Sequence, residues 1–360
     1  MPGTLRRTLF ALLLATLPAT AAAQGITVMG PDSSRLTFNG RVQTIFNTTS
    51  VDGVPQGEMA LRRVRLEATL RLSDLVSARI QPEYAGSRVV LKDAFVRLAI
   101  HPALNVWAGQ AFRPFGAIAQ TTSVRIPPIE RGVRVRGVSN AYDEYNLIFD
   151  LNYSERDVGL QIRGEPKGAP LGLTYAAGWF NGPARAEFPN ANTGQVAARI
   201  GIAPRRWMRM NVGYSGRDFG QRDTSVAGDV RVLRGAAWEA DLELGTDAHG
   251  PHALFEAVAG DFDPFAGARF HGAQAWLSYR GGRVSHRVSG VEPLLRVSHG
   301  DPDTGDDLDD DAGPHGGTLV TPGVNLWLGG LNRVTLNYDV WAPRGGENAH
   351  GLKAMFQLAF

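Results

Sequence analysis

The chain has no cysteine and almost no lysine. Of its 37 basic residues, all are arginine except Lys92, Lys167 and Lys353. Without cysteine the fold cannot depend on disulfides, which stabilise many small secreted domains. Arginine presents a planar fork of donors that binds oxyanions bidentately. A GC-rich genome explains most of this bias, so the placement of the arginines is more informative than their number.

The sequence also lacks an apolar run of the roughly 20 residues that a membrane-spanning helix needs. The apolar stretch 9–17 is shorter, follows Arg6 and Arg7, and precedes a run of alanines. This order is typical of a cleaved signal peptide. We therefore expect residues 1–23 to be removed and residues 24–360 to form a single exported domain without a transmembrane helix.

The dominant pattern is an alternation of apolar and polar residues in segments of about ten residues. Within 59–72, for example, Val64, Leu66 and Ala68 alternate with arginines and an acid. Successive side chains of a strand point to opposite faces, so each segment has one apolar and one polar face. The segments that we predict to be strands are 36–46, 59–72, 76–84, 90–100, 104–111, 158–165, 171–181, 193–203, 207–217, 231–245, 251–260, 268–280, 287–299, 317–328, 332–342 and 350–360.

The connections between these segments alternate in length, as in outer-membrane barrels. In hydrocarbon every backbone N–H and C=O must be paired, so strands cross a membrane only as a closed barrel. We predict an all-β fold, a transmembrane antiparallel β-barrel of about 16 strands with both ends on the short-turn side. The short connections are 73–74, 101–103, 166–170, 204–206, 246–250, 281–286 and 329–331, and the longer ones are 47–58, 112–155, 182–192, 218–230 and 300–316.

The longest connection is rich in arginine. It spans 112–155, and its part 112–136 contains five arginines and a single acid. We predict that this long third outer loop folds into the lumen and forms a pore constriction that attracts anions. The alternative is that some of the arginines pair with Glu130, Asp143 or Glu144 and hold the loop against the wall. The predicted constriction residues are Arg113, Arg125, Glu130, Arg131, Arg134 and Arg136.

A second group of arginines lies on the polar faces of the first strands. Charge is tolerated in a wet lumen, whereas an unpaired charge in a packed core costs several kcal/mol. Pairing with Glu67, Glu83 and Asp93 is the alternative role for these arginines. The segment 231–245 carries Glu239, Asp241 and Glu243 on its polar face, and such an acidic wall argues against strong anion selectivity. The predicted lumenal basic track is Arg41, Arg63, Arg65, Arg71, Arg79 and Arg97.

An ordered series of motifs resembles the phosphate-selective porin O and P family of Gram-negative outer membranes. The resemblance is dense as far as residue 182 and covers most of the mature chain. It implies a sixteen-stranded, trimeric channel whose members bind phosphate or polyphosphate through lumenal basic residues. The final strand, ending at Phe360, resembles the signal that the barrel-assembly machinery recognises. The chain departs from the family in its scarcity of lysine, which leaves phosphate specificity open. The motifs are LRRVRLEATLRL at 61–72, VVLKDAFVRL at 89–98, WAGQAFRPFG at 107–116, IPPIERG at 126–132, RDVGLQIRGEP at 156–166, YAAGWFNG at 175–182 and VEPLLRVSHGD at 291–301.

We therefore predict an outer-membrane porin for passive diffusion of small hydrophilic solutes, with a modest preference for anions such as phosphate and no cofactor. Its expected partners are outer-membrane lipid and lipopolysaccharide, and not nucleic acid. A general non-selective diffusion porin is the alternative. An outer-membrane hydrolase is less well supported, because the chain contains no G-x-S-x-G motif. A secreted sugar-binding β protein is the third possibility.

No metal site is expected from the sequence. The acidic stretch 301–311 has its glycine one position too early for a calcium-binding loop, so we predict a solvated outer loop there. His249 and His252 belong to a predicted turn and do not form a metal-binding motif. No catalytic residue is predicted either.

Overall fold

The computed structural model describes residues 25–30, 34–51, 54–86, 88–187, 193–222, 230–303 and 315–360. The predicted signal peptide, 1–23, and most of the acidic stretch 301–311 lie outside these residues. Both assignments therefore stay predictions.

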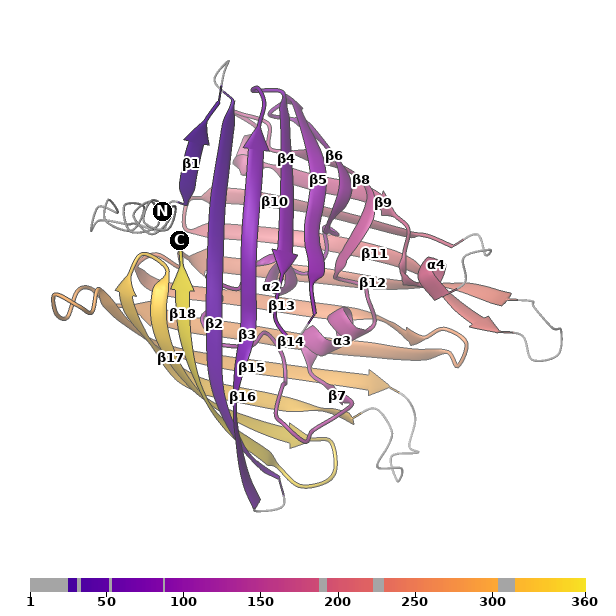
Figure 1. The fold of residues 1–360 in the computed structure, drawn as a ribbon. Coiled ribbons are helices and arrows are strands. Elements are labelled where there is room, and N and C mark those ends of the chain that lie inside the picture. Colours follow the sequence, from indigo (N-terminus) through magenta and orange to yellow (C-terminus); the bar gives the residue numbers. More distant parts are fainter. Residues whose placement is uncertain are drawn as a thin grey trace, which may run out of the picture.

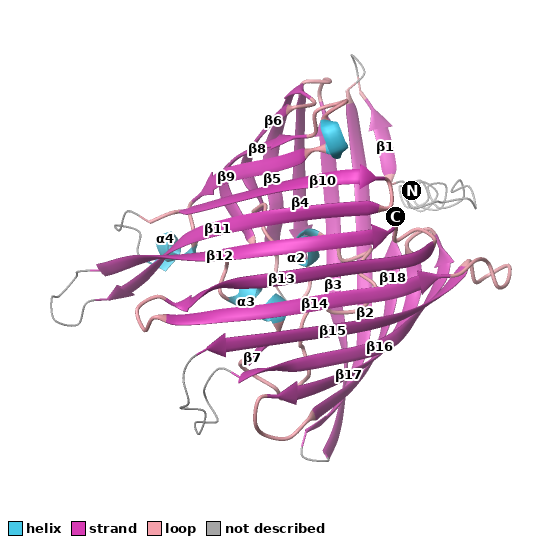
Figure 2. Ribbon diagram, turned by 180° about the vertical axis from the view of Figure 1, so that it is seen from behind, coloured by secondary structure: helices cyan, strands magenta, loops and turns pink. Residues whose placement is uncertain are grey.

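The described residues form a closed antiparallel β-barrel of sixteen strands (Figures 1 and 2). Each strand pairs with the next along the chain, and the last closes the sheet by pairing with the first, Leu352 opposite Thr48. The predicted fold class and strand number are confirmed. The strands are β2 (Arg35–Val51), β3 (Val54–Arg71), β4 (Val76–Glu83), β5 (Val90–His101), β6 (Leu104–Phe112), β8 (Arg156–Gly164), β9 (Thr174–Phe180), β10 (Gln195–Arg205), β11 (Met208–Arg222), β12 (Val230–Gly245), β13 (Gly250–Asp263), β14 (Ala268–Arg280), β15 (Gly290–Asp303), β16 (His315–Gly329), β17 (Asn332–Pro343) and β18 (Ala349–Ala359).

Short elements complete the fold. β1 (Ile26–Met29) pairs with β2, and β7 (Ala141–Tyr142) pairs in parallel with the start of β16. The helices are α2 (Ala117–Gln120), α3 (Glu144–Asp150), α4 (Pro183–Glu187) and the 3-10 turn η2 (Pro170–Gly172). Among the described residues, no helix is both long and apolar enough to cross a membrane.

Two of the predicted long loops are wrong. In 47–58 and 218–230, the strands continue almost to the hairpin tips, so that Thr48 pairs with Gly57 and Phe219 with Leu233. The apolar alternation ends earlier than the strands do. Ladder hydrogen bonds join backbone groups and do not require apolar side chains, so a hairpin can extend past the apolar band with polar residues.

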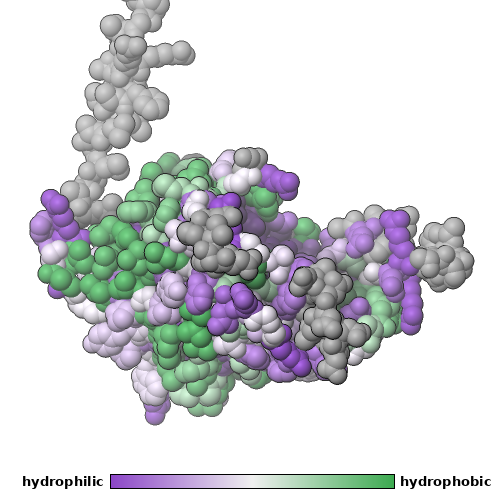
Figure 3. Space-filling view, turned by 90° about the horizontal axis from the view of Figure 1, so that it is seen from below, coloured by the Kyte–Doolittle hydropathy of each residue, from purple (hydrophilic) through white to green (hydrophobic). Residues whose placement is uncertain are grey.

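The barrel is polar on the face that it buries and apolar on the face that it exposes. In β18, Lys353 and Gln357 are buried, whereas Leu352 and Phe356 are exposed at 47% and 64%. Other strands repeat this arrangement, and hydrophobic side chains gather in broad areas of the outer surface (Figure 3). A soluble protein has the opposite arrangement. The pattern is that of a barrel whose outer face meets lipid.

The segment 113–155, which contains α2, β7 and α3, lies between the walls of the barrel in both ribbon views (Figures 1 and 2). It forms hydrogen bonds with inward-pointing side chains on strands from several sides of the sheet, including Gln43 of β2, Glu256 of β13 and Arg296 of β15. The segment therefore occupies part of the interior and divides the remaining space.

Candidate functional site

The first part of the segment 113–155 rests on the wall formed by β12, β13 and β14. The Gly116 N–H donates to Glu239 Oε2 at 2.6 Å, and the Ile118 N–H donates to Glu256 Oε2 at 2.8 Å. The first N–H groups of a helix have no partner within it, so these wall carboxylates satisfy the start of α2. The carboxylates thus act as a seat for the segment.

Apolar packing reinforces this seat. A cluster of buried residues joins the segment to inward-pointing wall residues such as Leu254 and Trp276. Burying a side chain of the size of isoleucine or phenylalanine contributes about 1.5–3 kcal/mol. The barrel wall is thus locally apolar inside, where it carries the segment. The segment contributes Phe115, Ala117, Ile118, Ala119, Ile126, Tyr145, Leu147, Ile148 and Tyr153 to the cluster.

Farther along, the segment is attached to the strands β15, β16 and β17. Arg296 donates to the Glu130 carbonyl at 2.7 Å, and Arg333 donates to the Ile126 carbonyl at 2.7 Å. The Ile129 N–H donates to Asn337 Oδ1 at 2.7 Å. These bonds use backbone groups of the segment, so side chains of the wall determine its path.

Glu130 connects the segment to a third part of the wall, on β3. It accepts hydrogen bonds from both Arg62 and Arg63. Gln43 lies opposite Arg63 and Thr44 lies opposite Leu61, so Arg62 is the extra residue of a β-bulge. A bulge changes the direction in which side chains point, and here two consecutive arginines reach the same carboxylate.

The charge of Glu130 is stabilised by this contact. Burial alone would raise the pKa of Glu130, but the Arg62 guanidinium, through charge and hydrogen bonding, and then Arg63 lower it well below its ordinary value. Arg62 was not predicted as a site residue, because simple alternation places it on the outer face. An arginine at an otherwise apolar position was the available signal.

An arginine-lined cavity of about 260 Å³ remains between the segment and the wall formed by β2 to β5. Nine basic and five acidic side chains line it, an excess of positive charge. The basic residues are Arg41, Arg62, Arg63, Arg65, Arg79, Lys92, Arg131, Arg134 and Arg156, and the acidic residues are Glu67, Glu83, Asp93, Glu130 and Glu155.

Larger and smaller cavities adjoin it. A cavity of about 900 Å³ shares Arg62, Glu130 and Arg134 with the arginine-lined cavity. At the other end, a cavity of about 180 Å³, which Phe360 also lines, shares Arg41 and Arg65 with it. The arginine-lined cavity is thus much smaller than the space on one side of it and lies between the two.

Two arginines of this cavity have no carboxylate partner in the described part of the chain. Arg41 donates to Thr122 Oγ1 at 3.0 Å and to Ser123 Oγ at 2.8 Å. Arg131 donates to the carbonyl oxygens of Ile118 and Thr121. Burial lowers the pKa of Arg131, and the nearby arginines lower it further. A guanidinium keeps its proton in proteins, so both side chains present positive charge held in place by neutral acceptors.

Other basic residues of the cavity are neutralised. Arg65 pairs with Glu83, and Arg156 pairs with Asp93 at 2.5 Å. The Arg156 guanidinium also lies 3.8 Å from the centre of the Phe112 ring. The pairing that was considered as an alternative for these strands is therefore present at some positions and absent at others.

The arginines of the predicted basic track do not all line the same cavity. Arg41, Arg63, Arg65 and Arg79 line the arginine-lined cavity. Arg71 is exposed and pairs with Asp74 at a turn. Arg97 donates to Asn105 and lines a separate cavity of about 300 Å³.

The predicted constriction residues are also separated. Glu130, Arg131 and Arg134 line the arginine-lined cavity, and Arg136 lines the cavity of about 900 Å³. Arg113 is buried and pairs with Asp157 at 3.3 Å. Arg125 pairs with Asp247 at 3.2 Å in another cavity.

The partners of these arginines differ from those considered in the sequence. Glu130 is taken by Arg62 and Arg63, whereas Arg134 lies 3.5 Å from Asp150 and Arg136 lies 3.9 Å from Glu58. Within 113–155, which is described throughout, no arginine forms an ion pair with Asp143 or Glu144. The spacing of arginines along a loop could not reveal which of them share a cavity.

The acids of β12 that were expected to form an opposing charged wall are bound by other side chains. Arg199 lies 3.2 Å from Glu239 and also pairs with Asp241. Glu243 pairs with Arg209 at 3.1 Å and lies 3.2 Å from His252. These acids bind arginine, histidine and backbone N–H groups, which reduces their effect on the potential in the lumen.

No protein-family model matches the sequence, and no curated protein matches it. Solved structures are similar in fold. The anion-selective porin from Comamonas acidovorans has 14% identity and a TM-score of 0.60, covering 91% of this chain and 100% of that one. OprB of Pseudomonas putida has 12% identity and a TM-score of 0.63, with coverage of 90% and 94%. OmpT of Vibrio cholerae in its trimer form has 11% identity and a TM-score of 0.58, with coverage of 91% and 100%.

At these identities the similarity establishes the fold alone, that of outer-membrane porins. The closer resemblance to the phosphate-selective porin O and P family is not confirmed by it and stays a prediction.

Proposed function

We propose that the chain is an outer-membrane porin for passive diffusion of small hydrophilic solutes, with a modest preference for anions. The strongest support is that the barrel exposes apolar side chains on its outer face and buries polar side chains inside. Leu160, Val212 and Trp238 are about half exposed or more, whereas Gln161, Asn211 and Glu239 beside them are buried. Apolar surface on this scale is stable in lipid, and a polar interior suits water and hydrophilic solutes.

The preference for anions rests on Arg41 and Arg131. Their charges face the arginine-lined cavity, which is much smaller than the cavity of about 900 Å³ beside it, and are not cancelled by a bonded carboxylate. Charge in a narrow space with low-dielectric walls produces a potential of several kT and concentrates ions of opposite sign. Arginine also suits oxyanions geometrically, so phosphate is the anion that we expect to interact most strongly.

General diffusion without selectivity is the second candidate. The pairs Arg65–Glu83 and Arg156–Asp93 neutralise part of the cavity, and five acids line it. The preference that we propose is therefore modest and not a strict specificity.

The proposed location is the outer membrane of a Gram-negative bacterium, with lipid and lipopolysaccharide around the apolar outer face. We also propose that the C-terminal strand, which exposes Phe356, Leu358 and Phe360, is recognised by the barrel-assembly machinery. A homotrimer is the assembly that we expect, since a similar solved structure is described as a trimer form.

Single-channel recording in a planar bilayer under a KCl gradient tests this proposal. We expect an anion-selective reversal potential and a chloride current that added phosphate reduces. A reversal potential near zero without an effect of phosphate would leave general diffusion as the function. Absence of channels from a correctly folded preparation would contradict the porin assignment itself.

A further inference from the structure

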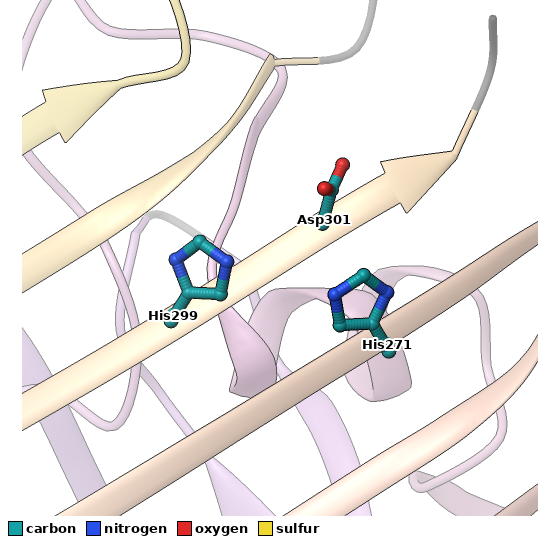
Figure 4. Close-up of side chains that lie close together, drawn as sticks. All are labelled: His271, His299 and Asp301. Carbon is teal, nitrogen blue, oxygen red and sulfur yellow. The ribbon is translucent and has the colours of Figure 1, made fainter.

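Three metal-ligating side chains meet on the outward face of β14 and β15, away from the arginine-lined cavity. One ligand atom from each of His271, His299 and Asp301 lies within 4.8 Å of the others. Figure 4 shows the two imidazole rings and the carboxylate on the same side of the two strands. We propose that these three residues bind a divalent transition-metal ion with the preferences of Zn²⁺.

The strand register places the three residues together. His271 lies directly opposite Asp301 in the antiparallel pair, and His299 precedes Asp301 by two positions. Side chains at this spacing leave the same face of a strand. Because ladder hydrogen bonds hold both strands, the three donors start from a rigid backbone, and little ordering is required when a metal binds.

The His299 ring is oriented by a neighbour on the next strand. Its Nδ1 lies 2.9 Å from Thr318 Oγ1, and Thr318 is the residue directly opposite His299 on β16. A hydrogen bond at Nδ1 leaves Nε2 available as a ligand, which is the usual arrangement around metal-binding histidines. In Figure 4 a ring nitrogen of His299 and one of His271 face each other.

The donor set indicates the class of metal. Two imidazoles and one carboxylate are typical of Zn²⁺ and related ions, whereas Ca²⁺ and Mg²⁺ prefer oxygen ligands. Three protein ligands leave a fourth position for water. Arg344 Nη1 lies 2.9 Å from Asp301 Oδ1, so its charge positions the carboxylate but also competes with the metal.

The sequence did not indicate this site, because His271 is far from the other two in the chain. Only the pairing of β14 with β15 brings the donors together. The site does not depend on the proposed porin function, since it lies on the opposite face of the wall from the lumen.

Metal binding by the purified full chain in detergent tests the proposal. Zn²⁺ is titrated calorimetrically, and Co²⁺ is used for its visible absorption, both with excess Ca²⁺ to occupy weak sites that consist of carboxylates alone. We expect one ion per chain. His271→Ala and His299→Ala should each weaken binding at least about tenfold. His350→Ala, which removes another outward-facing histidine, should leave binding unchanged.

A further variant distinguishes this site from general surface binding. Arg344→Gln releases Asp301 from an exposed ion pair and should tighten binding about two- to fivefold. Retention of the heat-dependent gel shift of a folded barrel is the control for each variant. Equal affinity in wild type, His271→Ala and His299→Ala would overturn the proposal, and so would the absence of Zn²⁺ binding to the folded wild-type chain.

Discussion

Two walls of the barrel use charged residues for different purposes. On β12 and β13, Glu239 and Glu256 accept hydrogen bonds from backbone N–H groups of the segment 113–155. On β2 to β5, arginines and acids line a cavity that the segment does not fill. The first wall is a structural seat, whereas the second faces the space in which solutes would move.

The difference follows from what each charge contacts. A buried carboxylate must be paired, and a helix start offers the N–H groups that it needs. Arg41 and Arg131 instead contact hydroxyl and carbonyl oxygens, which position a cation without neutralising it. In the porin that we propose, the local partner of a charge, and not only the number of charges on a wall, therefore determines its contribution to selectivity.

The largest effect is expected from reversing charges of the arginine-lined cavity. Arg79 and Arg134 line it with side chains that are about two-fifths exposed, so substitution should not unfold the barrel. Arg79→Glu combined with Arg134→Glu would remove the excess of positive charge. We expect the ratio of anion to cation permeability, measured from reversal potentials, to fall about fivefold or more.

Arg71→Glu is the matched control for that double variant. Arg71 is also an exposed strand arginine, but it pairs with Asp74 at a turn and does not line the cavity. Its reversal should leave the permeability ratio nearly unchanged. Because the control reverses one charge and the double variant two, a change in the control half as large as in the double variant would show that the overall charge of the barrel, and not this cavity, determines selectivity.

Substituting the wall carboxylates that hold the segment 113–155 should change the stability of the barrel and not its ion selectivity. Glu256→Ala leaves the buried Ile118 N–H without its acceptor, at a cost of about 1–3 kcal/mol. Glu256→Gln keeps an acceptor oxygen and should be much less destabilising. The midpoint of thermal unfolding, followed by the gel shift of the folded barrel, distinguishes the two variants.

A variant on the wall formed by β2 to β5 is the comparison for Glu256→Ala. Glu83→Gln, in the arginine-lined cavity, should increase anion preference with little effect on the unfolding midpoint, because it frees Arg65. If Glu256→Ala changed selectivity as strongly as Glu83→Gln does, the two walls would not have the separate roles described above.

Glu144 of α3 predicts a pH dependence of stability. Burial, and then the charge of Asp143, raise the pKa of Glu144 well above its ordinary value of 4.5, and a hydrogen bond from Gln274 opposes this only in part. The folded chain thus favours the protonated carboxyl. The stabilisation that the protonated Glu144 gives to the folded chain is fully present below the pKa that Glu144 has in the unfolded chain. It is lost as the pH rises through the pKa that Glu144 has in the folded chain.

Glu144→Gln imitates the protonated side chain at every pH. The variant should therefore unfold at a higher temperature than wild type in mildly alkaline buffer and at a similar temperature in acid. Glu165→Gln, at an exposed turn position, is the control that removes a carboxyl without burial. A parallel pH dependence in wild type and Glu144→Gln would exclude Glu144 as its source.

The sequence was sufficient to predict the barrel but only part of the candidate site. Alternation with a period of two determines which face of each strand is apolar, and this property is local. It predicted the sixteen strands and the inward faces of Arg63 and Arg65. It did not locate hairpin ends such as Thr48–Gly57, where polar residues continue the ladder.

The content of the cavity depends on contacts between residues far apart in the chain. Arg113 and Arg131 belong to the same arginine-rich run, yet Arg113 is buried against Asp157 and Arg131 lines the cavity. Arg62 reaches Glu130 only because a bulge interrupts the alternation. Neither the partner of a loop residue nor a bulge is encoded in spacing, so these features required the structure.

The smallest effect is expected at this bulge, where Glu130 attaches the segment 113–155 to β3. Arg62 is partly exposed, and Arg63 also lies 3.5 Å from Glu130, so Glu130 has a second arginine partner. Arg62→Gln should therefore lower the free energy of unfolding by only about 1 kcal/mol. A double-mutant cycle with Glu130→Gln measures the coupling, because each single variant removes one partner. A coupling of about 1 kcal/mol would show that the arginine pair holds the segment to the arginine-lined wall. Additive effects would show that Arg296 and the other attachments to β15–β17 are sufficient to hold the segment in place. Arg62 would then contribute charge to the cavity without stabilising the position of the segment.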